Sequence, residues 1–173
     1  MRKYLLIPCL LLFIGCDDGD LQIETVDFDS IETIQTCGAV SPTASNVLFK
    51  INSDEALILT LPSGLLKNEA TTTEIESVVP GASQISYRIF SDNVTSAYFC
   101  DSPPPLTPIV LEEIEAAAGS ILVTTTTADS LTYTHTIRLS GITFLNENGS
   151  RITDLQINEF GTVTTVGTAT AKN

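Results

Sequence analysis

In the ten residues from Leu131 to Ser140, mostly apolar or aromatic side chains alternate with polar ones at a period of two. This is the spacing of a strand with one buried face, because successive side chains of a strand point to opposite sides. Similar stretches rich in Thr, Val and Ile recur along the chain and predict an all-β fold, an antiparallel β-sandwich of about seven to nine strands. One strand face carries Leu131, Tyr133, His135, Ile137 and Leu139.

Turn residues divide the remaining alternating stretches into further expected strands. Residues 67–83 are polar and predict a long loop, and residues 52–55 predict a four-residue hairpin loop. Beyond Gly141 the apolar positions shift to Ile142 and Phe144, which predicts a β-bulge at the glycine. The other expected strands cover residues 21–28, 31–37, 47–51, 56–61, 85–89, 95–100, 121–127, 152–160 and 162–166.

Residues 107–119 carry the local signals of one short helix. Thr107 followed by Pro108 fits an N-cap with proline in the first helical turn. Glu112 and Glu113 would then lie near the positive end of the helix, and Gly119 would end it. The predicted fold class is therefore an all-β sandwich with one short helix.

The apolar run from Tyr4 to Ile14 is eleven residues long, too short to cross a hydrocarbon core of roughly 30 Å as a permanent helix. Two basic residues precede it, as in an export signal. Gly15-Cys16 then resembles the lipobox of bacterial lipoproteins, although Phe13 stands where leucine is usual. The resemblance implies cleavage before Cys16 and acylation of its sulfur and amine, which would anchor the protein to a membrane. The alternative is an ordinary secretory signal followed by a cysteine.

Seven acidic residues lie between Asp17 and Glu32. Acids directly after a lipidated cysteine resemble the surface-export signal of Bacteroidota lipoproteins, and this start of the chain is similar to uncharacterised flavobacterial lipoproteins. The resemblance implies an outer-membrane protein exposed on the cell surface. A periplasm-facing location is the alternative, and in enterobacteria Asp17 would imply inner-membrane retention. The expected organisation is a signal peptide (1–15), an acidic tether (16–20), a single β-sandwich domain (21–168) and a loose C-terminal tail (169–173).

The charge of the chain restricts its partners. The net charge is −13, and removal of residues 1–15 would take away Arg2 and Lys3 but no acid, leaving −15. Such a charge repels phosphate backbones and anionic lipid surfaces, so nucleic-acid binding is not expected. No glycine-rich phosphate loop is present, and no cofactor is expected.

Cys37 and Cys100 would be the remaining pair of cysteines after Cys9 leaves with the signal and Cys16 is lipidated. In an exported, oxidising compartment this pair predicts a disulfide. A metal site is the alternative, but His135 is the only histidine and supplies too few soft ligands. No metal site is therefore expected.

Catalytic motifs are absent, and His135, on an inward strand face, is expected to be structural. The expected function is that of a non-enzymatic binding or structural module with a protein or glycan partner. One alternative is a hydrolase with a carboxylate pair, for which Glu112, Glu113 and Glu115 are the nearest cluster. Another is a calcium-stabilised adhesion module, in which acids near strand ends would supply oxygen ligands.

Two short patterns indicate possible modification. Asp29-Ser30-Ile31 and Asp129-Ser130-Leu131 resemble the O-glycosylation acceptor of Bacteroidota, which makes Ser30 and Ser130 candidate sites. Asn93 and Asn148 lie in N-glycosylation sequons, but most bacteria do not use that signal. Phe28 is expected to point inward between Asp27 and Asp29, whose side chains would form an exposed acidic face.

Overall fold

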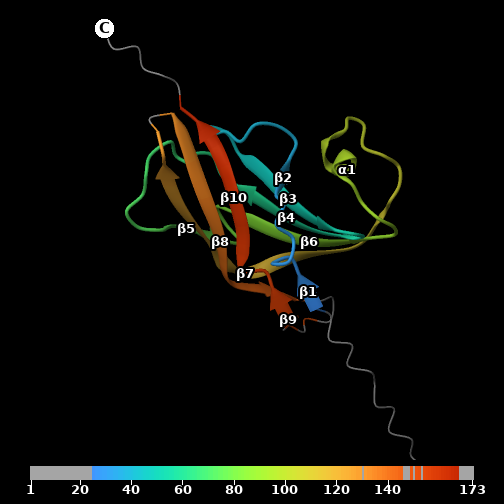
Figure 1. The fold of residues 1–173 in the computed structure, drawn as a ribbon. Helices are drawn as coiled ribbons and strands as arrows, with labels where there is room; N and C mark the ends of the chain where they lie inside the picture. The colour runs from blue at the N-terminus through green and yellow to red at the C-terminus, as the bar shows by residue number, and fades with distance from the viewer. Residues whose placement is uncertain (1–24, 130, 146–148, 150, 153, 168–173) are drawn as a thin grey trace, which may run out of the picture.

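The computed structural model describes residues 25–129, 131–145, 149, 151–152 and 154–167. Strands dominate this part of the chain, and it contains one five-residue helix, so the expected all-β class with one short helix is confirmed. None of its helical residues forms a segment long and apolar enough to cross a membrane. Figure 1 shows β1 (Thr25–Asp27), β2 (Gln35–Thr36), β3 (Asn46–Asn52), β4 (Glu55–Leu61), β5 (Ile75–Val79), β6 (Gln84–Phe90), α1 (Ser96–Cys100), β7 (Val110–Thr127), β8 (Thr132–Phe144), β9 (Asp154–Gln156) and β10 (Glu159–Val166).

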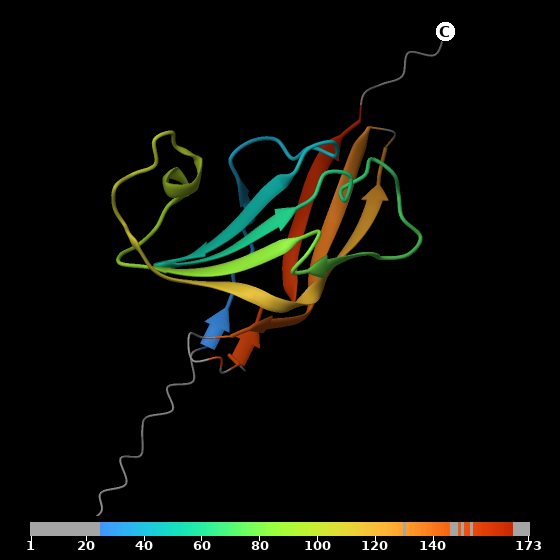
Figure 2. The ribbon, with the colours of Figure 1, turned by 180° about the vertical axis from the view of Figure 1, so that it is seen from behind.

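One curled sheet contains most of the strands, in the order β10-β8-β7-β6-β4-β3-β2, with β5 paired to β7 beside this path. The long strand β7 belongs to both halves of the sheet. It pairs with β6 from Val110 to Glu115 and with β8 from Ala116 to Thr127. The two layers of the sandwich are therefore halves of one antiparallel sheet that turns over along β7 (Figure 2). A separate parallel pair, β1 and β9, lies at one end of the molecule (Figure 1).

The hydrophobic core lies between the two halves of the sheet. Tyr87 on β6 is fully buried, and its ring centroid is 6.2 Å from that of Phe28 and 6.2 Å from that of Phe144. Burial of aliphatic and aromatic surface from both halves supplies the main stabilising contribution to folding. Other core residues are Leu57 and Leu59 on β4, Ile121 and Val123 on β7, Ile137 and Leu139 on β8, and Phe160 on β10.

The predicted β-bulge at Gly141 is confirmed. Pairing with β7 jumps from Ser140 to Thr143, and Gly141 has a φ of 62°, which glycine adopts without steric cost. Leu139 before the bulge and Ile142 after it are both buried. The extra residue therefore keeps the apolar side chains of β8 pointing into the core on both sides of the glycine.

The predicted helix over residues 107–119 is wrong, because β7 runs through most of this stretch. Thr107 and Pro108, the predicted start of the helix, lie in the loop before the strand. Within the strand, buried Ile114 and Ala116 alternate with exposed Glu113 and Glu115. Hydrogen bonding to β6 and burial of the inner face outweigh the local helix signals, which are weak compared with tertiary contacts.

The predicted strand over residues 95–100 is also wrong, because α1 occupies these residues. Thr95 makes no side-chain cap bond, so the helix depends on its tertiary contacts rather than on capping.

Gly119 does not end a helix, as was predicted, but lies within β7. A Cβ at this position would lie 2.8 Å from the Cα of Ile142, so only glycine allows β7 and β8 to approach this closely.

Four other strand or loop boundaries differ from prediction. The predicted loop over 67–83 contains β5, which pairs with β7, and the hairpin loop at 52–55 reduces to Ser53 and Asp54. Only two residues of the expected strand 31–37 are paired, as β2. The expected strand 152–160 divides into β9 and the start of β10, because β9 pairs with β1 outside the main sheet. The predicted edge strand at 162–166 is confirmed as part of β10.

Candidate functional site

The outer face of β3, β4, β6 and β7 changes in chemical character across the strands. The register places Phe49 beside Ile58, Ile58 beside Ser86, and Ser86 beside Glu115. The next row contains Arg88 beside its cross-strand partner Glu113. The exposed side of this half-sheet is therefore apolar over β3 and acidic over β7.

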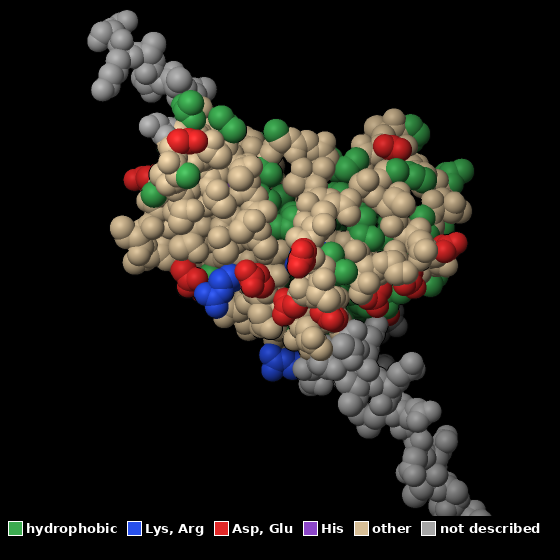
Figure 3. All heavy atoms as spheres, in the orientation of Figure 1, with side chains coloured by type: hydrophobic (Ala, Val, Ile, Leu, Met, Phe, Trp, Pro, Cys, Tyr) green, Lys and Arg blue, Asp and Glu red, His purple; other side chains and the backbone are tan. Residues whose placement is uncertain are grey.

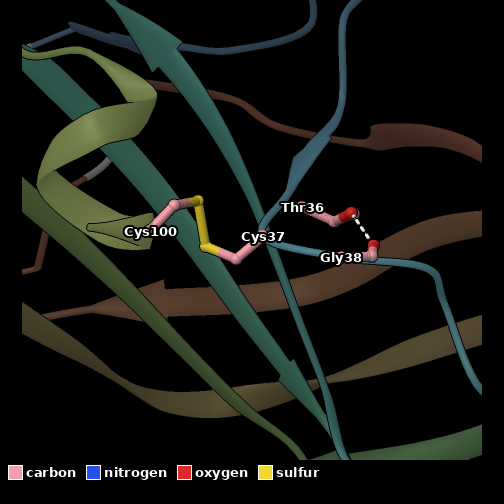
Figure 4. The surroundings of a disulfide bond; sticks show 4 residues. All are labelled: Thr36, Cys37, Gly38 and Cys100. Atoms are coloured by element: carbon pink, nitrogen blue, oxygen red, sulfur yellow. Dashed lines mark hydrogen bonds between the residues drawn. A yellow bond between two sulfur atoms is a disulfide. The ribbon is translucent and has the colours of Figure 1, made fainter. Parts of the chain in front are cut away.

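A disulfide holds α1 against the β3 side of this face. It joins Cys100, at the end of α1, to Cys37, directly after β2, with a Cα–Cα distance of 5.0 Å. Figure 4 shows this bond and the neighbouring hydrogen bond from the Thr36 hydroxyl to the Gly38 carbonyl oxygen. The predicted cysteine pair is thus bonded in the structure, although Cys100 ends a helix and not a strand.

Aromatic rings fill the space between α1 and the sheet. Phe99 stacks on Phe49 with 4.3 Å between ring centroids, and Tyr98 meets Phe90 edge-on at 4.9 Å. These rings form a second small core on the outer face, together with Ile58 and neighbouring residues. Aromatic pairs of this kind contribute roughly 0.5–1.5 kcal/mol each beyond the burial of their area. The helix therefore acts as a fixed cap over half of the outer face.

The part of the outer face that the cap leaves open is a groove of about 340 Å³. Phe99 lies at one side of it and Pro80, after β5, at another. Ile58, Thr60 and Ser86, from the neighbouring strands β4 and β6, also line it. We call this cavity the outer groove; its other lining residues are Val47, Gln84, Ile85, Arg88, Glu113, Glu115 and Ala116.

Two carboxylates border the outer groove on β7. Glu113 and Glu115 are two residues apart on one strand face, so their Cα atoms are separated by roughly 7 Å. Arg88 contacts one oxygen of Glu113 with both its Nε and its Nη2, each at 2.8 Å. Glu115 has no such ion pair among the described residues. Of the three glutamates considered for catalysis, Glu112 faces the other side of the strand, so the structure does not bring the three together.

A second cavity, of about 530 Å³, contains a buried lysine. The Lys50 ammonium donates hydrogen bonds to the backbone oxygens of Phe28 at 2.8 Å and Glu159 at 3.1 Å. Burial lowers the pKa of Lys50, while the carboxylates of Asp29, Glu159 and Asp27 oppose this shift. The ammonium therefore links the segment after β1 to the start of β10, which is a structural role.

His135 is fully buried between two threonines of neighbouring strands. Its Nδ1 lies 2.8 Å from Thr125 Oγ1, and its Nε2 lies 2.8 Å from Thr165 Oγ1. The Thr165 hydroxyl donates its proton to Asn68 Oδ1, so its oxygen must accept a hydrogen bond from the Nε2–H of His135. This network assigns the neutral imidazole with its proton on Nε2, and both ring nitrogens are engaged by buried threonine hydroxyls. Among the described residues no carboxylate is hydrogen-bonded to the ring. The location agrees with the structural role expected from the sequence.

Burial lowers the pKa of His135 below its ordinary value of 6.5. The unfolded chain therefore takes up a proton at a higher pH than the folded chain, and the free energy of unfolding should fall as the pH drops below about 6.5. The slope from this one group is at most about 1.4 kcal/mol per pH unit. Urea unfolding between pH 7.5 and pH 5 should show a smaller loss for His135→Gln than for the wild type. Parallel stability curves for the two proteins would contradict this assignment.

The remaining predicted sites are only partly within the described residues. Ser30 is exposed, so its hydroxyl is accessible, and its N–H donates a hydrogen bond to Asp27 Oδ1. Phe28 is buried and Asp29 is exposed, as expected, whereas Asp27 is half-buried and its Oδ1 accepts hydrogen bonds from the N–H groups of Asp29 and Ser30. Cys16 and Ser130 lie outside the described residues. The described part of the chain contains no cluster of three or more His, Cys, Asp or Glu residues suited to hold a metal ion.

The sequence does not predict the outer groove or the burial of Lys50. Lys50 shares an inward face with Leu48 on a short apolar strand, and a charged residue in that phase is the available signal. The groove has no sequence signal, because its walls come from β3, α1, the β5–β6 turn and β7. Only the folded chain brings these segments together.

The fold and the groove define this protein as a disulfide-linked all-β domain with an open, partly acidic groove on the outer face of its sheet. Comparison with protein-family models, with curated proteins and with solved structures finds no match to this chain.

Proposed function

We propose that this protein is a lipid-anchored envelope protein that uses the outer groove to bind a partner without catalysing a reaction. Its anchor would be the acylated Cys16, and its location the exposed side of an outer membrane. The observation that carries the binding role is the groove between a disulfide-held cap and the acidic strand β7. A preformed concave site with a few convergent polar groups is the usual form of a binding site.

The short connection from Cys16 to β1 supports the anchored arrangement. Thr25 follows Cys16 by nine positions, a distance of at most roughly 30 Å when fully extended. β1 and β9 lie at one end of the domain (Figure 1). In this proposal that end faces the membrane, and the outer groove is held close to the cell surface.

A carboxylate hydrolase is the alternative with one observation in its favour. Glu113 and Glu115 lie on one strand face beside the groove, and glycoside hydrolysis uses a pair of neighbouring carboxyl groups. Against it, Glu113 is engaged by Arg88 and both glutamates are exposed, whereas carboxyl pairs that divide acid and base roles occupy contrasting environments. Binding is therefore the better supported function.

The acidic tether provides a test of surface location. Changing Asp17, Asp18 and Asp20 together to Asn should move the protein to the periplasmic side of the membrane if an export machinery reads these acids. Protease added to intact cells should then cut the wild type and spare the variant. Since these residues carry almost no apolar surface, the melting temperature should hardly change.

The matched control neutralises three exposed acids elsewhere in the chain, by changing Asp54 and Asp101 to Asn and Glu69 to Gln. This variant should be cut on intact cells like the wild type. Equal cleavage of the tether variant and the wild type would show that the acids are not a surface address.

A further inference from the structure

We propose that the outer groove binds a cationic, amphipathic peptide segment of a partner protein. An apolar side chain of the segment would lie over β3 and the cap, and a lysine or arginine about four residues away would contact the carboxylates on β7. This inference rests on the proposed binding function and specifies the chemistry of the ligand.

The apolar half of the groove is incompletely covered. Val47 on β3 is 49% exposed, although its neighbours Phe49 and Ile58 are buried under the cap. Thr60, beside Val47 across the β3–β4 pair, is short and leaves space above it. A ligand with an aliphatic side chain can therefore cover Val47 and the edge of Phe99 without displacing α1.

The acidic half of the groove has unused hydrogen-bonding capacity. Arg88 directs both of its bonds to Oε1 of Glu113, and Oε2 accepts no hydrogen bond from any described residue. Glu115 makes no hydrogen bond or ion pair within that same part of the chain. Two carboxylates against one arginine leave a local net charge of −1. An ammonium or guanidinium group of the ligand would balance it through charge-assisted hydrogen bonds.

The charge of the whole chain favours the same class of partner. The sequence has 21 acidic residues against 8 basic ones, and Figure 3 shows acidic side chains gathered along the edge of the domain near β1, β7 and β9. A field of this sign attracts cationic partners and repels nucleic acids, anionic lipids and acidic glycans. Binding should therefore weaken as salt is added.

The groove presents its two chemistries side by side across four strands. Row by row, apolar side chains on β3 and β4 are followed by Ser86 or Arg88 on β6 and by Glu115 or Glu113 on β7. Neighbouring strands are roughly 4.8 Å apart, so Val47 on β3 and the carboxylates on β7, three strand spacings away, are separated by roughly 14 Å across the sheet. An extended peptide that crosses the strands covers this distance in about four residues, so the groove fits a segment with an apolar residue at one position and a basic residue about four positions away.

The test uses the full chain purified in detergent and a fluorescein-labelled heptapeptide with valines at one end and lysines at the other. Fluorescence anisotropy should show saturable binding, and a peptide with glutamate in place of lysine should not bind. Glu115→Gln should weaken binding about tenfold, the effect of losing one charge-assisted hydrogen bond. Val47→Ser should weaken it about threefold to tenfold by removing apolar contact. The matched control Glu69→Gln removes the same charge away from the groove and should leave affinity within twofold.

Each other outcome overturns the inference in a distinct way. Equal weakening by Glu115→Gln and Glu69→Gln would mean non-specific attraction and no groove ligand. Sensitivity to Val47→Ser without sensitivity to Glu115→Gln would refute a cationic ligand but keep the groove as a binding site. Dimers that dissociate in the Val47→Ser variant would identify a second copy of the chain as the occupant. No effect of any groove variant, with unchanged melting temperatures, would also remove the proposed binding function.

Discussion

Replacing both Cys37 and Cys100 with serine should lower the free energy of unfolding by roughly 4 kcal/mol. The disulfide closes a loop with a sequence separation of 63 residues, and loop closure of this length restricts the unfolded chain by that amount in the chain-entropy model. For a domain of this size the loss is a large fraction of the expected total stability. Urea unfolding of the two proteins, followed by circular dichroism, would measure the difference.

The same substitution should loosen the cap locally. α1 has no side-chain N-cap bond and buries no residue completely, so without the disulfide its position depends on Tyr98 and Phe99 alone. Amide hydrogen exchange should therefore become faster in α1 while the exchange of β7 and β8 is little changed.

Reduction of the wild type is the control for this prediction. Adding dithiothreitol should lower the stability of the wild type towards that of the serine variant and leave the variant unchanged. A difference below about 1 kcal/mol between the oxidised protein and the variant would contradict the account, since the aromatic contacts would then hold the cap unaided.

The long strand β8 shows how much of the fold the sequence specifies. The alternation from Leu131 to Ser140 predicts a strand with one buried face, and the glycine after it predicts the bulge. Both are local consequences of the two-residue period and of the φ values that glycine allows. Elements of this kind are predictable because their determinants lie within the element itself.

The errors lie where distant segments decide the outcome. Residues 107–119 carry capping signals but become strand, because β6 supplies hydrogen-bond partners and the core accepts Ile114 and Ala116. The sequence does not predict β5, because its pairing partner is at least forty residues further along the chain. Propensity is a weak prior, and tertiary pairing overrides it.

The candidate site was less predictable than the fold. The cysteine pair follows from the compartment that the export signal implies, together with the count of remaining cysteines. The outer groove depends on the distance between α1 and the β5–β6 turn and on which residues the cap leaves uncovered. Glu115 illustrates the difference, because the sequence suggests a helix surface and the structure places it on the wall of a groove.

Changing Cys16 to alanine should abolish stable attachment to the membrane. One acyl chain gives only marginal, reversible membrane binding, whereas several chains on one residue give stable anchoring. In cell fractionation with detergent phase separation, the wild type should partition into the detergent phase. The variant should be found as an unprocessed precursor or in the aqueous phase, and Cys9→Ala should behave like the wild type. Equal partitioning of the Cys16 variant and the wild type would contradict the anchor.

The most direct test of the lipid-anchored account is the mass of the N-terminal peptide of the protein extracted from its own cells. The account predicts that residues 1–15 are missing and that the first residue is Cys16, carrying a diacylglyceryl group on its sulfur and an acyl group on its amine. The Cys16→Ala variant should yield no N-terminal peptide of this acylated mass, because its residue 16 has no sulfur to acylate. An N-terminal peptide in which Cys16 is unmodified, or one that still contains residues 1–15, would contradict the central claim.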